Sequence, residues 1–325
     1  MRPVDQAKRP VYAVWEVTLR CDLACKHCGS RAGKGRPDEL STDEALSLVD
    51  QLADLGVREV SLIGGEVYLR DDWEAIVRRV RDRGLSCGIV TGGRGFDRAR
   101  SQAAKDAGVS AVSVSVDGLE STHDRLRGVR GSHAAAMEAL GHLEAVGLTR
   151  SCNTQLNRWN LHEIPTLFES LIPTGIHAWQ VQFTVAMARA ADNASMLLEP
   201  YQLLEAMPMV ASLKRRADEA GVRLWSGNNV GYFGPFEKDL YEGSSAGHHL
   251  SCGAGTSGLG IEANGDVKGC PSLPTADYVG GNLRDLSLQQ IWEQTQPLRF
   301  TRDRTTEELW GFCKTCYYAE DCMAG

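Results

Sequence analysis

Short β-branched segments alternate with longer amphipathic segments over the first two thirds of the chain, and this alternation constrains the fold more than any other feature. The amphipathic segments have helical periodicity, which is typical of βα units around a parallel sheet. Six units are too few for a closed eight-stranded barrel, so we expect an α/β fold, a partial (β/α)6 barrel with its chemistry at the carboxyl ends of the strands. The six expected strands are residues 12–18, 59–63, 86–91, 111–116, 151–156 and 179–184.

The sequence changes character after Trp225. Glycine-rich turns follow at 226–229 and 243–247, and residues 259–268 have the pattern of a β-hairpin that turns at Asn264-Gly265. We therefore expect two domains, the partial barrel at 1–225 and a smaller cysteine-rich domain at 226–325. Within the first domain, Ser41 and Glu44 fit a capping box that begins a helix.

Composition narrows the class of protein. The chain has 325 residues and a net charge of −7, so it lacks the broad basic surface that neutralises nucleic-acid phosphates. No apolar run reaches membrane-spanning length, and residues 1–9 are too polar for a secretory signal. We expect a soluble, cytoplasmic protein that binds neither nucleic acid nor membrane. In that compartment, ten cysteines favour metal ligation over disulfides.

Three cysteines follow the first expected strand. Cys21, Cys25 and Cys28 form a C-x3-C-x2-C motif, and three thiolates suit a four-iron cluster with one iron left open for a substrate or cofactor. The alternatives are a chance grouping or a structural zinc site, although structural zinc takes four ligands, commonly in C-x2-4-C pairs.

This motif resembles that of the radical S-adenosylmethionine (SAM) superfamily, which carries C-x3-C-x2-C after the first barrel strand. The resemblance implies that the three cysteines hold a [4Fe-4S] cluster whose open iron binds SAM, and that SAM is cleaved to a 5′-deoxyadenosyl radical. It also implies that Gly64-Gly65-Glu66, at the end of the second expected strand, contacts the SAM ammonium, with glycines permitting close approach of the backbone. His27 stands where the family often has an aromatic residue near the adenine.

Residues 113–118, followed by Arg127, resemble the ribose and carboxylate segment of the branch that matures peptides and sulfatases. The resemblance implies that Ser115 faces the SAM ribose and that Arg127 pairs with the SAM carboxylate through a charge-assisted bond. The alternatives are a turn or capping role for Ser115 and Asp117, and an exposed salt bridge for Arg127.

Alternation along four expected strands predicts a polar interior. Side chains two residues apart share one face of a strand, and a barrel built only for packing would carry Val, Ile and Leu on its inner face. We therefore expect cofactor and substrate to share a lined cavity, with Asn153 and Gln155 on the cofactor. The polar pairs are Glu16 and Thr18, Ser113 and Ser115, Asn153 and Gln155, and Gln180 and Gln182. The isolated Cys87 and Cys152 are expected in the hydrophobic core.

The remaining five cysteines lie in the last quarter of the chain. Their spacing resembles the SPASM domain, an iron-sulfur extension of many peptide-modifying radical SAM enzymes. On that plan Cys252 and Cys270 serve one auxiliary [4Fe-4S] cluster, and Cys313, Cys316 and Cys322 serve a second. The plan asks for two more cysteines after Cys322, so either the sequence is shorter than the natural protein or the auxiliary clusters are incomplete or otherwise ligated. The alternative is a zinc ribbon formed by Cys252, Cys270, Cys313 and Cys316.

Relatives that carry a SPASM domain mostly act on peptides or protein side chains, so the resemblance implies a maturase that crosslinks or oxidises a ribosomally made peptide. The first expected strand begins near the N-terminus, so leader recognition would use the barrel, the C-terminal region or a separate leader-binding protein. A flavodoxin or ferredoxin would act as the reducing partner. Two other classes stay open: a radical SAM enzyme acting on a small molecule, and a noncatalytic iron-sulfur or zinc protein. The sequence assigns no catalytic acid or base.

Overall fold

Ten strands form one continuous sheet in the computed structural model, which describes residues 8–227, 230, 234–241 and 252–324. The strand order is β10-β9-β8-β1-β2-β3-β4-β5-β6-β7, and neighbouring strands from β8 to β7 are parallel. The strands are β1 (Tyr12–Glu16), β2 (Glu59–Ile63), β3 (Ser86–Thr91), β4 (Ala111–Ser115), β5 (Thr149–Leu156), β6 (Ala178–Phe183), β7 (Arg223–Ser226), β8 (Gly258–Ile261), β9 (Asp266–Lys268) and β10 (Gly281–Asn282).

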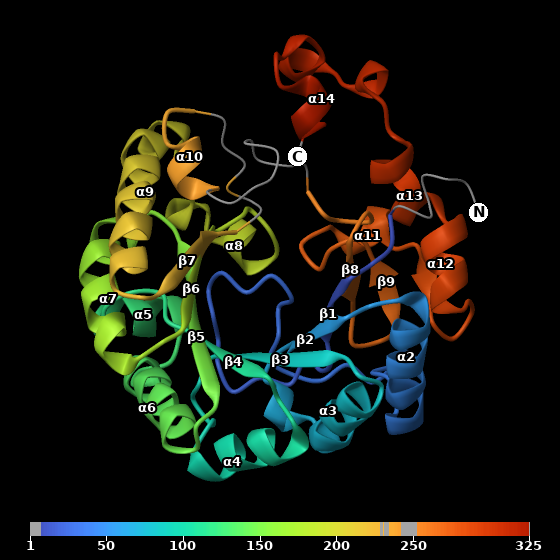
Figure 1. Cartoon of the computed structure of the whole chain (residues 1–325), viewed down its shortest axis with the longest axis horizontal. Helices are drawn as coiled ribbons and strands as arrows, with labels where there is room; N and C mark the ends of the chain where they lie inside the picture. Colours follow the sequence, from blue (N-terminus) through green and yellow to red (C-terminus); the bar gives the residue numbers. More distant parts are fainter. Residues whose placement is uncertain (1–7, 228–229, 231–233, 242–251, 325) are drawn as a thin grey trace.

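Helices surround the curved sheet and cover its outer face, while the loop after β1 lies on the inner side (Figure 1). Strand residues such as Trp15 and Trp179 are fully buried in one hydrophobic core with helix residues such as Leu48 and Ile76. The α-helices are α2 (Thr42–Leu55), α3 (Trp73–Asp82), α4 (Arg98–Ala107), α5 (Glu120–Arg127), α6 (Ser132–Ala145), α7 (Ile164–Leu171), α8 (Arg189–Asp192), α9 (Leu203–Glu219), α10 (Glu237–Leu240), α11 (Thr275–Tyr278), α12 (Leu288–Gln294), α13 (Gln296–Asp303) and α14 (Ala319–Cys322).

The predicted α/β class and partial barrel are confirmed. All six expected strands are present, β2 and β3 with the predicted bounds and the others within two residues of them at each end. The prediction missed β7, which pairs with β6 in parallel and extends the barrel by one strand. The capping box is confirmed as well, because Ser41 Oγ accepts from Glu44 N and the Glu44 carboxylate accepts from Ser41 N.

The predicted hairpin is present as β8 and β9, and Gly265 in its turn has a φ of 90°. Its position adds a feature that the sequence did not indicate, because β8 also pairs in parallel with β1. The sheet therefore continues across the expected domain boundary at 225/226, which stays a prediction. The glycine-rich stretch 243–247 lies outside the described residues.

The end of the described chain, including α14, projects away from the sheet (Figure 1). Within the described residues, none of the helices combines the length and the apolar character that a membrane crossing requires.

Candidate active site

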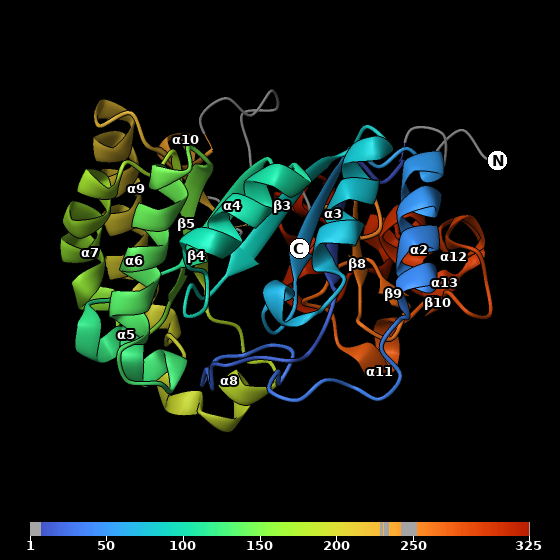
Figure 2. The ribbon, with the colours of Figure 1, turned by 90° about the horizontal axis from the view of Figure 1, so that it is seen from below.

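The three cysteines of the C-x3-C-x2-C motif lie in the loop between β1 and α2. Two backbone hydrogen bonds join the ends of this loop segment, from Gly33 N to Leu19 O (2.8 Å) and from Cys21 N to Gly33 O (3.1 Å). Helix α8 packs against it from the other side of the barrel, since Arg189 Nη2 donates to Ala32 O at 2.6 Å. Figure 2 shows the loop and α8 at the same end of the molecule. Cys25 is buried, whereas Cys21 and Cys28 are half-buried.

The Gly64-Gly65 turn follows β2 and packs directly on this loop. Gly65 N donates to Thr18 O at 2.7 Å, and Glu66 N donates to Arg20 O at 2.8 Å. A Cβ at Gly64 would overlap the Thr18 carbonyl oxygen, and a Cβ at Gly65 would overlap that of Arg20. The glycines therefore permit close approach of the cysteine loop. The sequence predicted that they would permit close approach of a ligand.

Glu66 is buried at the end of this turn. Its carboxylate accepts from Thr91 Oγ1 at 2.5 Å and from Gly92 N at 2.6 Å. Burial disfavours the charged carboxylate and raises its pKa to about 7, although both hydrogen bonds oppose the shift. Ligand-capable atoms of Cys21, Asp22 and Glu66 lie within 4.8 Å of one another, so the turn and the cysteine loop form one site.

Asp117, just beyond β4, connects the cysteine loop to the barrel. Its Oδ2 lies 2.7 Å from Arg127 Nη2 and 3.3 Å from His27 Nε2, while its Oδ1 accepts from Gln155 N at 2.9 Å. Burial opposes ionisation, but the Arg127 guanidinium and then His27 outweigh it and hold the pKa of Asp117 well below its ordinary value. Asp117 is thus a buried carboxylate that contacts three of the predicted cofactor residues, Arg127, His27 and Gln155.

Arg127 lies between this carboxylate and the cysteine motif. It is 8% exposed, so the alternative of an exposed salt bridge is wrong. Its Nη1 lies 3.7 Å from Cys25 Sγ, and its carbonyl oxygen accepts from Ala24 N at 3.0 Å. The end of α5 is thereby fixed against the cysteine loop.

Two buried nitrogens of this site have no hydrogen-bond partner among the described residues, Arg127 Nε and His27 Nδ1. Buried polar atoms are nearly always paired, so such atoms in one site fit a ligand that accepts hydrogen bonds. The three thiols, the guanidinium and these two atoms suit a [4Fe-4S] cluster together with an amino-acid carboxylate. We propose that Cys21, Cys25 and Cys28 hold the cluster.

The predicted polar rows cross the inner face of the sheet. The register places Ser115 opposite Asn153 and Asn153 opposite Gln180, and it places Gln155 opposite Gln182. Ser115 is buried and the four amides are half-buried. Thr18 departs from the expectation of a cavity-lining residue, because it is fully buried and its Oγ1 donates to Glu39 at 2.9 Å. Ser115, Asn153 and Gln155 remain proposed cofactor residues.

The C-terminal cysteines lie in two other places. Cys270 follows β9 close to Cys252, and the chain around Cys270 packs on Gly260 of β8. Cys313, Cys316 and Cys322 belong to the projecting end of the chain, where Cys316 N donates to Cys313 O at 3.3 Å. Cys87 and Cys152 are fully buried in the core.

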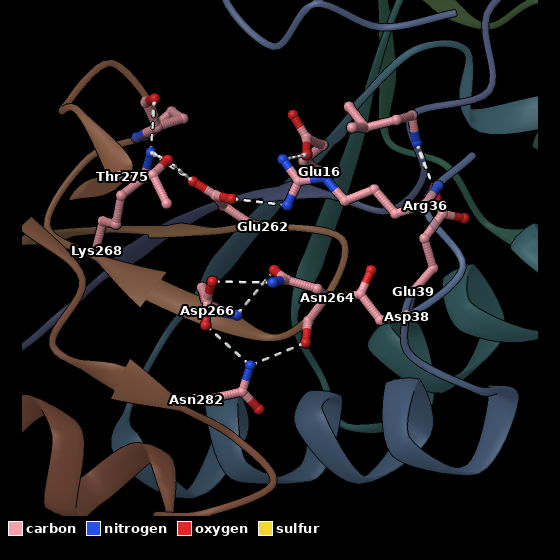
Figure 3. Close-up of polar contacts among 12 residues, drawn as sticks. Glu16, Arg36, Asp38, Glu39, Glu262, Asn264, Asp266, Lys268, Thr275 and Asn282 are labelled. Carbon is pink, nitrogen blue, oxygen red and sulfur yellow. Dashed lines mark hydrogen bonds and ion pairs between the residues drawn. The ribbon is translucent and has the colours of Figure 1, made fainter. Parts of the chain in front are cut away.

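Sequence reasoning missed a buried ionic network on the hairpin side of the site (Figure 3). Glu262 lies 2.8 Å from Lys268 Nζ and 2.9 Å from Arg36 Nη1, and Arg36 Nη2 lies 4.0 Å from Glu16. Burial raises the pKa of Glu16, whereas Lys268, Thr275 and Arg36 outweigh burial and lower that of Glu262. Glu16 was expected to line the cavity, and it instead joins the hairpin to the cysteine loop.

Two domain families match this chain. Residues 15–169 match the Radical SAM superfamily, and residues 252–317 match SPASM, an iron-sulfur cluster-binding domain. The chain is 30% identical over 330 residues to the AdoMet-dependent heme synthase of Nitratidesulfovibrio vulgaris, with 95% of this chain and 85% of that protein covered. It is 28% identical over 302 residues to the Fe-coproporphyrin III synthase of Methanosarcina barkeri, with 88% and 74% covered.

Two further similarities are to a relative whose name refers to a peptide and to a solved structure. The PqqA peptide cyclase of Ruegeria pomeroyi is 28% identical over 312 residues, with 94% of this chain and 79% of that protein covered. The crystal structure of Streptococcus suis SuiB bound to S-adenosylmethionine superposes with a TM-score of 0.78, covering 98% of this chain and 73% of SuiB, at 17% identity. That degree of identity supports the fold alone.

Proposed function

This chain belongs to the radical SAM superfamily, and from that premise we propose that it is a radical SAM enzyme acting on a small molecule of the tetrapyrrole class. The observation that carries the proposal is its similarity, over nearly the whole chain, to AdoMet-dependent heme synthase. The Fe-coproporphyrin III synthase supports the same substrate class.

The expectation of a peptide maturase is contradicted. Relatives named for heme, coproporphyrin and pre-heme d1 synthesis match this chain at identities up to 30%, and these names refer to small molecules. The SPASM resemblance misled because cysteine spacing reports the clusters that a domain holds, whereas the substrate is selected by the side chains of the barrel.

A [4Fe-4S] cluster and SAM supply a reducing electron and a 5′-deoxyadenosyl radical when they are bound. The protein itself would orient the cluster and SAM and shield them. Arg127 would hold the SAM carboxylate, and Asp117 keeps its guanidinium in place through the 2.7 Å ion pair. Glu66 would accept from the SAM ammonium with its free lone pairs, while Thr91 and Gly92 fix its carboxylate.

The test combines SAM cleavage with the candidate substrate class. Anaerobically reconstituted protein with dithionite and SAM should release 5′-deoxyadenosine. Addition of iron coproporphyrin III should raise the rate of this release, and the mass of the iron coproporphyrin III should itself change. A Cys21→Ala/Cys25→Ala/Cys28→Ala variant should release none, because no open iron remains. Release from that variant would contradict the radical SAM mechanism. Release from the unaltered protein without any change in iron coproporphyrin III would contradict the substrate class alone.

A further inference from the structure

Strand β7 brings an aromatic and a cationic side chain to the inner face of the barrel. Its Leu224 is fully buried, so the alternating Arg223 and Trp225 lie on the opposite face of the strand. The register places Trp225 opposite Gln180, which lies opposite Asn153. Trp225 therefore continues the polar row that contains the proposed cofactor residues.

Trp225 is more exposed than a packing role requires, and Arg223 lacks an ion-pair partner among the described residues. Trp225 is 42% exposed, although tryptophans of structural cores in this protein, such as Trp15 and Trp179, are fully buried. Arg223 makes no ion pair with any described residue, and its guanidinium lies 5.4 Å from the centre of the Trp225 ring. Arg36 and Arg127, by contrast, are paired with carboxylates.

Two amides complete the same surface. Gln180 and Gln182 are half-buried on β6, and neither side-chain amide forms a hydrogen bond with a described residue. Half-buried amides, an unpaired guanidinium and an open aromatic face together match a flat ligand that carries acidic groups. Neighbouring strands lie about 4.8 Å apart, so such a ligand would lie beside the cofactor row of β4 and β5.

We propose that Arg223, Trp225, Gln180 and Gln182 form the substrate platform, on which a planar tetrapyrrole stacks against Trp225 and presents a carboxylate to Arg223. This inference rests on the proposed function and specifies where its substrate lies. The amides of β6 orient the macrocycle between the platform and the cofactor row. Charge complementarity favours an acidic ligand, because Arg223 has no carboxylate partner among the described residues.

The experiment is calorimetric titration of coproporphyrin III into the anaerobically reconstituted full chain with SAM present. Trp225→Ala and Arg223→Ala should each raise the dissociation constant about tenfold, while Trp225→Phe and Arg223→Lys should retain most of the affinity. Tyr201→Ala and Arg98→Ala provide matched controls, because both residues are exposed and lie outside the barrel interior. Controls should bind as the unaltered protein does.

A second ligand separates the two contributions. The tetramethyl ester of coproporphyrin III keeps the ring and lacks the carboxylates, so Arg223→Ala should change its affinity less than about twofold, whereas Trp225→Ala should still weaken it. If the unaltered protein binds coproporphyrin III and the alanine variants bind it equally well, the platform alone is overturned. Absence of binding to the unaltered protein would overturn both the substrate class and the platform. If an alanine variant does not fold, three other variants decide the outcome. Trp225→Phe and Arg223→Lys should retain most of the affinity, and Gln180→Leu should bind coproporphyrin III weakly.

Discussion

At the scale of single residues, Asp117 determines how the candidate site is organised. It joins His27 of the cysteine loop to Arg127 at the end of α5, and it does so as a buried, ionised group. Sequence reasoning selected Arg127 and His27 from resemblance, and for Asp117 it favoured a turn or capping role over a cofactor role. The role of Asp117 depends on contacts between segments far apart in the chain, which no local pattern encodes.

Arg127 leads to a prediction on SAM binding. Arg127→Lys keeps the charge but loses the unpartnered Nε, and Arg127→Ala also leaves Asp117 buried without its counter-ion. Affinity for SAM should weaken in the order unaltered, Lys, Ala, with a total cost of roughly 2–5 kcal/mol. Calorimetric titration of SAM into reconstituted protein measures this, and iron content should stay constant across the series.

A compensating variant separates binding from structure. Arg127→Leu/Asp117→Asn removes the buried pair as a whole, so its stability should recover relative to Arg127→Ala while its SAM affinity stays low. Recovery of both stability and SAM affinity would mean that Arg127 acts only as a partner of Asp117. Arg78→Ala, which removes an exposed pair with Glu74, is the control.

At the scale of elements, the sequence predicted the bounds of two strands correctly and missed another strand altogether. β2 and β3 are flanked by amphipathic helices and were predicted with the right bounds. β7 is four residues long, too short for alternation to give a signal, so Arg223 and Trp225 were missed as candidate site residues. The pair between Arg36 and Glu262 spans 226 positions, and no sequence period reports such a contact.

The hairpin of β8 and β9 leads to a prediction on stability. Lys268 is 3% exposed, pairs with Glu262 and donates to Leu273 O at 2.7 Å. Lys268→Met should lower the free energy of unfolding at pH 7 by about 3 kcal/mol, since removing one partner leaves a buried carboxylate less compensated. Denaturant unfolding measures this, and the exposed Arg78→Met should cost about 0.5 kcal/mol or less.

The same substitution has a definite pH dependence. The pKa of Glu262 is lowered in the folded protein, so its contribution to stability is present above its unfolded pKa of about 4.3 and is lost as pH falls through the folded value. The difference in stability between the unaltered protein and Lys268→Met should therefore shrink as pH falls below about 4. A difference that stays constant down to pH 3 would show that lost packing, and not the ion pair, accounts for the effect.

At the scale of the whole molecule, one sheet connects two groups of cysteines, the C-x3-C-x2-C motif after β1 and the pair Cys252 and Cys270 around the hairpin. The parallel pairing of β8 with β1 puts the hairpin, with Cys270 just beyond it, beside the strand that leads into the C-x3-C-x2-C loop. The sequence indicated both cysteine groups through their spacing. It could not indicate their adjacency, because the parallel pairing of the first and eighth strands joins segments that lie far apart in the chain, and no local pattern reports such a pairing.

The projecting end of the chain gives the last prediction, which concerns iron content. Cys313 lies in the short 3-10 helix Gly311–Thr315 and Cys316 directly follows it, outside the sheet, so their loss should leave the barrel and its first cluster intact. Cys313→Ala/Cys316→Ala should therefore lower the iron content of reconstituted protein by about four irons per chain, the content of one [4Fe-4S] cluster, while SAM still binds. Cys87→Ala is the matched control, because Cys87 is fully buried in the core and burial raises the pKa of its thiol to about 12, which leaves it protonated and a poor metal ligand. Iron and zinc are measured together by plasma mass spectrometry. Stoichiometric zinc that disappears in the double variant, with iron unchanged, would assign these cysteines to a zinc ribbon and contradict the second auxiliary cluster.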